Sequence, residues 1–352
     1  MNVDHADRNF GGADDILFER SGRAGIVTLN RPAALNAVNH RMINALARAL
    51  AAWEVDDAVG QVVIRAEGRA FSAGGDILDI YEAGRAGHPP VDFFADEYRL
   101  NAAIARFPKP YVALIDGMVM GGGVGVSCHG SHRVMTENAV FSMPEVGIGF
   151  FPDVGGSHLL SRLPGAFGMY LALTGNRMRH GDARAVGLAT HTARADDLSA
   201  LMQSLCETDD VDAMLTAHTH ETARETDDAV MHAIARHFSL DTLDGVLASL
   251  AADGEDWAKT VSDTLAARSP TSLVVAFRQI RAGAMLSMDE CMRMEFRILN
   301  RMLVGHDFYE GIRAAIIDKK STPHWQPARR EAIEQADIDA YFAPPAGGDL
   351  DL

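Results

Sequence analysis

The feature that most limits what this chain can fold into is a recurring unit, in which a short apolar run leads through a glycine cluster into a helical pattern. Such units follow one another at intervals of roughly 40–50 residues in the first half of the chain. Residues 61–66 and 111–115 are apolar runs of strand length, and glycine clusters stand a few residues after each, at 74–75 and 121–123. This alternation of strands and helices predicts an α/β core.

Finer patterns place individual elements. Residues 16–20 and 25–30 are apolar runs on either side of a Ser-Gly-Arg turn, which predicts a hairpin. A helix is expected over about 39–54, because apolar residues recur there at helical spacing, and a second helix over 93–107.

The second half of the chain has a different character. After His191 glycine becomes sparse, and helical patterning dominates to about residue 319. The length of 352 residues exceeds the ~250–300 residues that one hydrophobic core usually serves, so two parts are expected. We divide the chain into an α/β core of residues 1–195 and a helical C-terminal region of residues 196–352.

Charge and hydropathy exclude several classes of partner. The chain has 32 lysines and arginines against 48 aspartates and glutamates, a formal net charge of −16, and no basic block interrupts it. That balance argues against nucleic acid and anionic membranes as partners. No apolar run reaches the ~18–20 residues of a membrane helix. Residues 1–15 are polar and acidic rather than signal-like, so we expect a cytoplasmic protein.

Neither cysteine nor histidine indicates a metal site. The three cysteines are scattered, so no disulfide framework or cysteine-based zinc site is expected, and they are most simply buried small residues. His129 and His132 are three positions apart, but no third ligand accompanies them.

Two glycine clusters are the first functional candidates. Gly74 and Gly75 precede Asp76, and adjacent glycines let backbone N–H groups approach a ligand; the alternative is a tight turn with Asp76 as a helix cap. Residues 121–125 enter a helix, where an unpaired N–H can face a developing negative charge. The dinucleotide-binding and nucleophile-elbow patterns each fail there, at Cys128 and His129 respectively.

A third candidate is a pair of carboxylates. Glu145 and Asp153 lie eight positions apart in a segment otherwise made of apolar residues, proline and glycine. Apolar surroundings raise the pKa of a carboxyl group, which suits acid–base chemistry. The alternative, in which both are exposed loop or capping residues, stays open on these residues alone.

Taken in this order, the motifs resemble those of the crotonase (enoyl-CoA hydratase/isomerase) superfamily. The resemblance covers roughly residues 16–195 and is carried by Asn30-Arg31-Pro32 with Leu35-Asn36-Ala37, by residues 71–76, by residues 117–125 and by Met143-Pro144-Glu145. It implies a spiral of β-β-α turns, an acyl-CoA bound across the core and an oxyanion hole of two N–H groups. By position, these N–H groups fall on Gly75 and Gly122.

A narrower resemblance extends over most of the chain. Residues 93–94, 97–101, 149–156 and 173–175, with a C-terminal stretch from Asp307 to Trp325, are similar to the 3-hydroxyisobutyryl-CoA hydrolases. The substrate-binding positions of that family fall on Glu97, Gly122, Glu145 and Asp153, and Ala73 is placed with them. The helical region from residue 196 on is then expected to complete and cover the site.

One departure separates this chain from the hydratases of the superfamily. Hydratases use two glutamates, one just after the glycine run and one at the position of Glu145. The first position is Gly125 here, whereas Asp153 stands where hydratases generally carry glycine. The changed acids suggest that a shared oxyanion hole serves a different reaction.

The resulting expectation is a hydrolase of a short β-hydroxyacyl-CoA, with 3-hydroxyisobutyryl-CoA of valine breakdown as the favoured substrate. Coenzyme A belongs to the substrate, and no metal or redox cofactor is expected. The alternatives are an enoyl-CoA hydratase, which is a lyase, and a non-catalytic acyl-CoA-binding protein. Members of the superfamily often form trimers, so a homo-oligomer is one option. A C-terminal part that folds back over its own core is the other.

Overall fold

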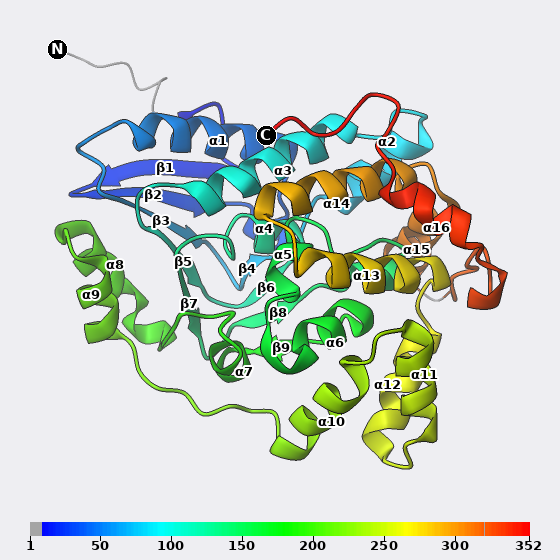
Figure 1. Cartoon of the computed structure of the whole chain (residues 1–352). Helices are drawn as coiled ribbons and strands as arrows, with labels where there is room; N and C mark the ends of the chain where they lie inside the picture. Colours follow the sequence, from blue (N-terminus) through cyan, green and yellow to red (C-terminus); the bar gives the residue numbers. More distant parts are fainter. Residues whose placement is uncertain (1–8, 320) are drawn as a thin grey trace. The chain divides into compact units, whose positions relative to one another are not determined.

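The computed structural model describes residues 9–319 and 321–352, and it divides into two compact units that are each built from separate stretches of chain (Figure 1). The first unit comprises the described residues up to Asp76, Asp96–Phe141 and Met178–Glu225. The second comprises Ile77–Ala95, Ser142–Arg177 and residues from Thr226 to the C-terminus.

The first unit contains two β-sheets. The larger has six strands in the order β1 (Ile16–Ser21), β2 (Ala24–Leu29), β3 (Gln61–Ala66), β5 (Tyr111–Ile115), β7 (His132–Thr136) and β10 (His191–Ala193). Only the β1–β2 pair of this sheet is antiparallel. The smaller sheet has the order β4 (Ala70–Ser72), β6 (Met118–Met120), β8 (Val140–Ser142) and β9 (Met178–Arg179).

The two sheets explain the spacing seen in the sequence. Strands β3 and β4, β5 and β6, and β7 and β8 follow each other along the chain, and the first of each couple joins the larger sheet while the second joins the smaller one. Each couple leads into helical structure. The expected α/β fold with β-β-α turns is therefore confirmed, together with a helical C-terminal region.

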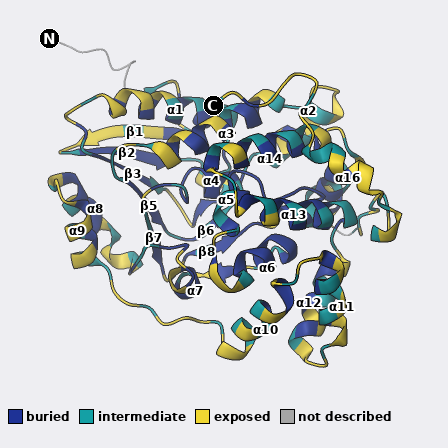
Figure 2. Cartoon of the chain, viewed as in Figure 1, coloured by how far each residue is buried: buried dark blue, intermediate teal, exposed yellow. Residues whose placement is uncertain are grey.

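The hairpin and the first helix match the sequence patterns closely. Strands β1 and β2 pair from Ile16 with Leu29 to Ser21 with Ala24. The edge strand β1 is largely exposed, whereas every residue of β2 is buried (Figure 2). Helix α1 (His40–Glu54) begins after Asn39, whose side chain accepts a hydrogen bond from the N–H of Met42. Such an N-cap satisfies a backbone group that the helix itself leaves unpaired.

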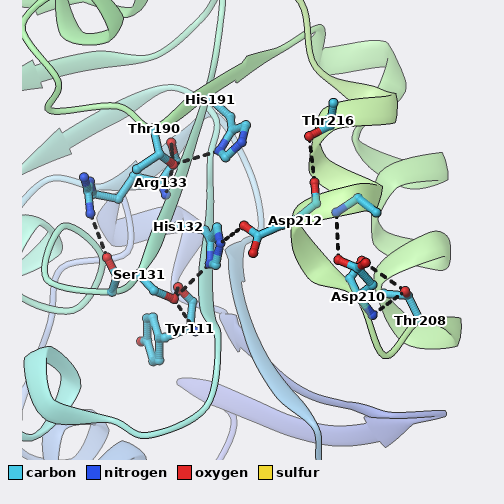
Figure 3. A network of polar contacts seen from close by, with 12 residues as sticks. Tyr111, Ser131, His132, Arg133, Thr190, His191, Thr208, Asp210, Asp212 and Thr216 are labelled. Carbon is cyan, nitrogen blue, oxygen red and sulfur yellow. Dashed lines mark hydrogen bonds and ion pairs between the residues drawn. The ribbon is translucent and has the colours of Figure 1, made fainter.

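Helices α8 (Leu198–Glu207) and α9 (Val211–His218) belong to the first unit, and their apolar residues join the core of the larger sheet. A polar network also connects α9 with β7 (Figure 3). Nε2 of His132 lies 3.0 Å from a carboxylate oxygen of Asp212, and its Nδ1 lies 2.9 Å from Oγ of Ser131. Both ring nitrogens of His132 thus have protein partners, and its role is to connect β7 with α9.

The remaining helices of the first unit are short. They are α4 (Gly122–Gly125) and α7 (His180–Ala185), with 3-10 turns at Pro32–Ala34 and Ala195–Asp197. Helix α3 (Val91–Arg106) belongs to the first unit from Asp96 onward.

The second unit is built from helices. They are α2 (Ile77–Arg85), α5 (Gly156–Leu160), α6 (Phe167–Thr174), α10 (Asp228–Phe238), α11 (Leu243–Ala252), α12 (Asp256–Ala266), α13 (Pro270–Gly283), α14 (Met288–Met302), α15 (His306–Ile312) and α16 (Gln335–Phe342). Shorter turns lie at η3 (Glu145–Ile148), Pro164–Ala166 and Arg330–Ala332, and a π-helix at Arg313–Ile317. All residues of α6 are buried, because none carries a charge and helices α5, α10, α12 and α13 pack around it.

The division of the chain near residue 195 into an α/β core and a helical region stays a prediction. The compact units cross it, since Met178–Glu225 belongs to the first unit and Ser142–Arg177 to the second. Packing rather than chain order defines such units. Among the residues that the structure describes, no helix is long and apolar enough to cross a membrane.

Candidate active site

The first unit carries two backbone N–H groups that have no acceptor among the residues described by the structure. Gly122 is the first residue of α4, where the helix cannot satisfy an N–H. Gly75 pairs with Val38 as a parallel bridge, in which the N–H of Val38 donates to the carbonyl of Gly74 and the N–H of Asp76 donates to the carbonyl of Val38. The N–H of Gly75 itself therefore points away from Val38. Neither glycine N–H has an acceptor among the described residues.

These two glycines are close neighbours. A Cβ atom placed on Gly122 would lie 3.4 Å from the nitrogen of Gly75 and 2.7 Å from Oε1 of Glu97. The second distance is too short for real atoms, so position 122 accepts a side chain only if Glu97 moves. Gly121, just before it, has φ 41 and ψ −122, which a residue with a Cβ rarely adopts. The structure thus brings Gly75, Gly122 and Glu97 together.

The residues beside Gly75 bond this turn to the segment that follows β2. The N–H of Ala73 donates to the carbonyl of Leu35 at 2.9 Å. The carboxylate of Asp76 accepts from the Arg31 guanidinium at 3.0 Å. Ala73 is half-buried, as is Gly75. Asp76 thus forms an ion pair that holds the turn.

Helix α3 presents a second buried polar side chain beside Glu97. Asn101 lies one helical turn further on, so both residues share a face of the helix. Glu97 is 2% exposed and Asn101 fully buried. Neither polar atom of the Asn101 amide has a hydrogen-bond partner among the described residues, an arrangement that costs ~1–3 kcal/mol per group. The sequence analysis gave Asn101 no role, although the i, i+4 spacing from Glu97 was a signal for it.

In the second unit, Glu145 opens the 3-10 turn η3 directly after Pro144. Its backbone carbonyl accepts the N–H of Gly149, a left-handed residue with φ 71, and that of Phe150. The Glu145 side chain is 7% exposed, and its Oε2 has no hydrogen-bond partner among the described residues. Nearby, the ring of Phe150 packs against those of Phe94 and Phe308, with centroids 6.0 and 4.8 Å apart.

This environment controls the protonation of Glu145. Burial raises its pKa well above the ordinary value, and the negative charges of Asp153 and Glu295 raise it further. Carboxylates that share a low-dielectric region resist simultaneous ionisation. Glu145 therefore holds a proton more tightly than a surface glutamate and is a suitable acid–base group.

Asp153 occupies a constrained turn in the same unit. It is 5% exposed, and its carbonyl accepts the N–H of Gly156 at 2.7 Å. The next residue, Val154, has a φ of 48, a left-handed conformation that is unfavourable for a β-branched side chain. Such a conformation costs on the order of 1–3 kcal/mol and persists only where neighbouring contacts impose it.

Two helices of the C-terminal region supply those contacts. Glu295 of α14 is fully buried and accepts the N–H of Gly155 at 2.8 Å and that of Ser157 at 2.9 Å. Gln279 of α13, also fully buried, donates to the carbonyl of Pro152 and to Oγ of Ser157. Neither residue was predicted from the sequence, because each stands among other polar residues of an amphipathic helix and nothing local marks it as buried.

The second unit therefore brings together Glu145, Asp153 and Glu295. The first unit independently brings together Gly75, Gly122 and Glu97. One arrangement offers neutral donors suited to an oxyanion, and the other offers buried carboxyl groups, of which Glu145 and Glu295 have raised pKa values.

Comparison with known proteins identifies the family of the chain. A family model described as enoyl-CoA hydratase/isomerase matches residues 24–342. A Danio rerio protein named 3-hydroxyisobutyryl-CoA hydrolase, mitochondrial, is 42% identical over 96% of this chain and 92% of its own. The Homo sapiens protein of the same name is 39% identical over 96% of this chain and 91% of its own.

Solved structures of similar fold carry different names. One titled carnitinyl-CoA dehydratase, from Mycobacterium thermoresistibile, has a TM-score of 0.89 and 42% identity, covering 95% of this chain and 98% of its own. Another, titled enoyl-CoA hydratase, from Rhodobacter sphaeroides 2.4.1, has a TM-score of 0.89 and 39% identity, covering 96% of this chain and all of its own (100%). The names of these relatives all include an acyl-CoA, but they differ in the reaction that they state: hydrolase, dehydratase or hydratase.

Proposed function

The chain belongs to the enoyl-CoA hydratase/isomerase family, and from that premise we propose that it hydrolyses a short β-hydroxyacyl-CoA thioester, with 3-hydroxyisobutyryl-CoA of valine degradation as the substrate. The family makes it an acyl-CoA-processing enzyme. The observation that carries the finer proposal is the buried pair of Glu145 and Asp153, with the pKa of Glu145 raised by burial and by the charge of Asp153. Hydratases of the superfamily use a second glutamate just after the glycine run, whereas position 125 is glycine in this chain; a hydratase that works with one glutamate is the alternative.

In the proposed reaction the N–H groups of Gly75 and Gly122 receive the thioester carbonyl oxygen. That oxygen gains negative charge as the carbon becomes tetrahedral. Fixed N–H donors stabilise this charge without reorganising, and losing one such donor typically costs ~2.7–4 kcal/mol. The proximity of the two glycines and their lack of protein acceptors support this role.

Glu145 is proposed as the group that activates the attack. As general base it takes a proton from water while the water oxygen bonds to the carbonyl carbon. The C–S bond then breaks, and the CoA sulfur leaves with a proton as the free thiol. As nucleophile it would instead form a mixed anhydride that water later hydrolyses. Both routes need the ionised carboxylate and give the same products.

Asp153 and Glu97 are proposed to recognise the substrate. Asp153 accepts a hydrogen bond from the β-hydroxyl, which a site built for unsaturated acyl groups does not need. A deoxy analogue would leave this buried carboxylate without a hydrogen-bond donor, which costs binding free energy. The contact therefore discriminates strongly between hydroxylated and deoxy substrates. Glu97, whose Oε1 stands beside Gly122, and Ala73 contribute to binding.

The decisive test follows the fate of the CoA thiol. Purified protein is incubated with 3-hydroxyisobutyryl-CoA, isobutyryl-CoA and a 2-enoyl-CoA, while free thiol and loss of the enoyl absorbance are recorded separately. We expect thiol release from the hydroxyacyl substrate. Hydration of the enoyl-CoA without thiol release would instead assign the lyase activity that the names of the two solved relatives indicate. Tight binding with no turnover of any substrate would identify a non-catalytic acyl-CoA-binding protein.

A further inference from the structure

We propose that Glu295 is a positioning residue, which fixes the backbone on the C-terminal side of Asp153 and thereby sets where the Asp153 carboxylate stands. The inference rests on the proposed function, in which the Asp153 carboxylate must be positioned to bind the substrate hydroxyl. Glu295 reaches this position from α14, 142 residues further along the chain.

The first support is the geometry of its carboxylate. Each oxygen accepts a different backbone N–H, Oε2 that of Gly155 and Oε1 that of Ser157. These groups belong to the start of α5, whose N-cap residue is a glycine with no side chain to cap the helix. Glu295 therefore supplies the cap from another helix, at the end where a negative charge is favoured.

The second support is that the other side of Asp153 is held as well. Gln279 of α13 donates to the carbonyl of Pro152 and to Oγ of Ser157. Between the two anchors, Val154 keeps its left-handed φ of 48. A β-branched residue stays in that conformation only where the surroundings impose it, and the bonds to Glu295 and Gln279 do so.

Charge gives Glu295 an effect that a simple structural contact lacks. The groups that face it are Asp153, Glu145 and, one turn earlier on α14, Cys291. Burial, with a smaller contribution from the charge of Asp153, outweighs the lowering effect of the hydrogen bonds from Ser157 and Gly155 and raises the pKa of Glu295 to about 8. In its ionised form Glu295 in turn raises the pKa of Glu145. Removing the charge while keeping the shape should therefore lower the pKa of Glu145.

The variant Glu295→Gln tests both effects. Its amide keeps one acceptor oxygen but turns an NH₂ group toward the second backbone N–H. We expect kcat for thiol release to fall by about 10- to 100-fold, with KM changed less, since misplacement of ~1 Å can cost on the order of 10²-fold. The acid limb of the pH–kcat/KM profile should also move to lower pH.

Two further variants complete the set. Glu295→Asp keeps the charge but is one methylene too short to reach both N–H groups, so it should lose rate and leave the acid limb nearer to that of the wild type. Glu290→Gln is the matched control, because Glu290 lies on the same helix but is exposed, in a capping box with Ser287. An E295Q enzyme with unchanged kcat and an unmoved acid limb would overturn the proposal.

A measurement on the unmodified protein covers the case in which Glu295→Gln does not fold. Without any substrate present, the amide protons of Gly155 and Ser157 should be protected from exchange with solvent by their hydrogen bonds to Glu295, and their resonances should shift together when Glu295 titrates. Amide protons of Gly155 and Ser157 that exchange as fast as those of exposed residues would overturn the proposal. Because no turnover is involved, this result is independent of whether the wild type releases thiol, which alone decides the proposed function.

Discussion

The two units of this protein offer opposite kinds of chemistry. The first unit supplies neutral backbone donors at Gly75 and Gly122, and it does so with residues whose essential property is the lack of a side chain. The second supplies Glu145, Asp153 and Glu295, three buried carboxyl groups whose properties depend on one another. Donor geometry is thus a matter of local backbone, whereas acid strength is a matter of burial and neighbouring charge.

The two units also differ in the kind of substitution that should damage them. In the first unit, added volume moves a donor or a neighbour. In the second, a change of charge alters proton affinity at unchanged volume. Variants that change only volume or only charge should therefore affect different measurements.

The largest effect is expected from Glu145→Gln, which keeps the shape and removes the ionisable group. Loss of the base should lower kcat by roughly 10²–10⁴-fold, while acyl-CoA binding measured by calorimetry persists. A folded variant that keeps more than about a tenth of the activity, within ~1.4 kcal/mol of the wild type, would show that Glu145 is neither base nor nucleophile.

Gly122→Ala should follow, because a Cβ at this position would lie 2.7 Å from Oε1 of Glu97. Displacing Glu97 and the Gly122 N–H should lower kcat/KM by ~10²–10³-fold, the range for loss of one oxyanion donor. The bulkier Gly122→Val should be worse, and melting curves must accompany both. Gly254→Ala is a suitable control for a glycine change, since no atom lies within 4 Å of a Cβ added there and its backbone is not left-handed. A stable Gly122→Ala enzyme with wild-type kcat/KM would remove Gly122 from the oxyanion hole.

Asp153→Asn should change the preference of the enzyme between hydroxylated and deoxy substrates. The wild type is expected to favour 3-hydroxyisobutyryl-CoA over isobutyryl-CoA by at least about tenfold, because the hydroxyl pairs with a buried carboxylate. The variant should lose most of that preference, and Asp153→Gly should lose both the preference and most of the rate. Equal cleavage of both thioesters by the wild type would point to a general thioesterase.

A pH effect on stability should accompany the raised pKa of Glu145. A folded-state pKa above the unfolded value makes a contribution to stability that is fully present below the unfolded pKa and is lost as pH rises toward the folded one. At neutral pH the buried carboxyl group of Glu145 therefore destabilises the wild type. Glu145→Gln should match or exceed the wild-type Tm there, and its advantage should shrink in acid. An advantage that grows in acid would contradict the sign of the shift.

The smallest effect concerns Asn101, whose buried amide has no partner among the described residues. Asn101→Leu keeps the volume and removes the unsatisfied groups, so it should stabilise the fold by ~1–3 kcal/mol in denaturant titrations. If the amide binds substrate beside Glu97, KM should rise at the same time. A destabilised variant would show that Asn101 is satisfied within the fold.

Location is a separate expectation. The cytoplasmic assignment made from composition stays a prediction, and the vertebrate relatives are mitochondrial by name.

The sequence by itself determined the local structure and the family. The β1–β2 hairpin, the capped helix after Asn39 and the buried strands β3 and β5 follow from patterns a few residues long, because turn chemistry and periodic burial act between near neighbours. The glycine positions and the order of the motifs also indicated where donors and acids would be sought.

Only the tertiary structure decided the position of Asp153 and the proton affinity of Glu145. Glu295 and Gln279 stand far from Asp153 in the chain, and nothing in their local sequence separates them from solvated polar residues of other helices. The raised pKa of Glu145 likewise arises from burial and from charges that folding brings near. Desolvation and Coulomb interaction depend on distance in space rather than along the chain, so no sequence spacing encodes them.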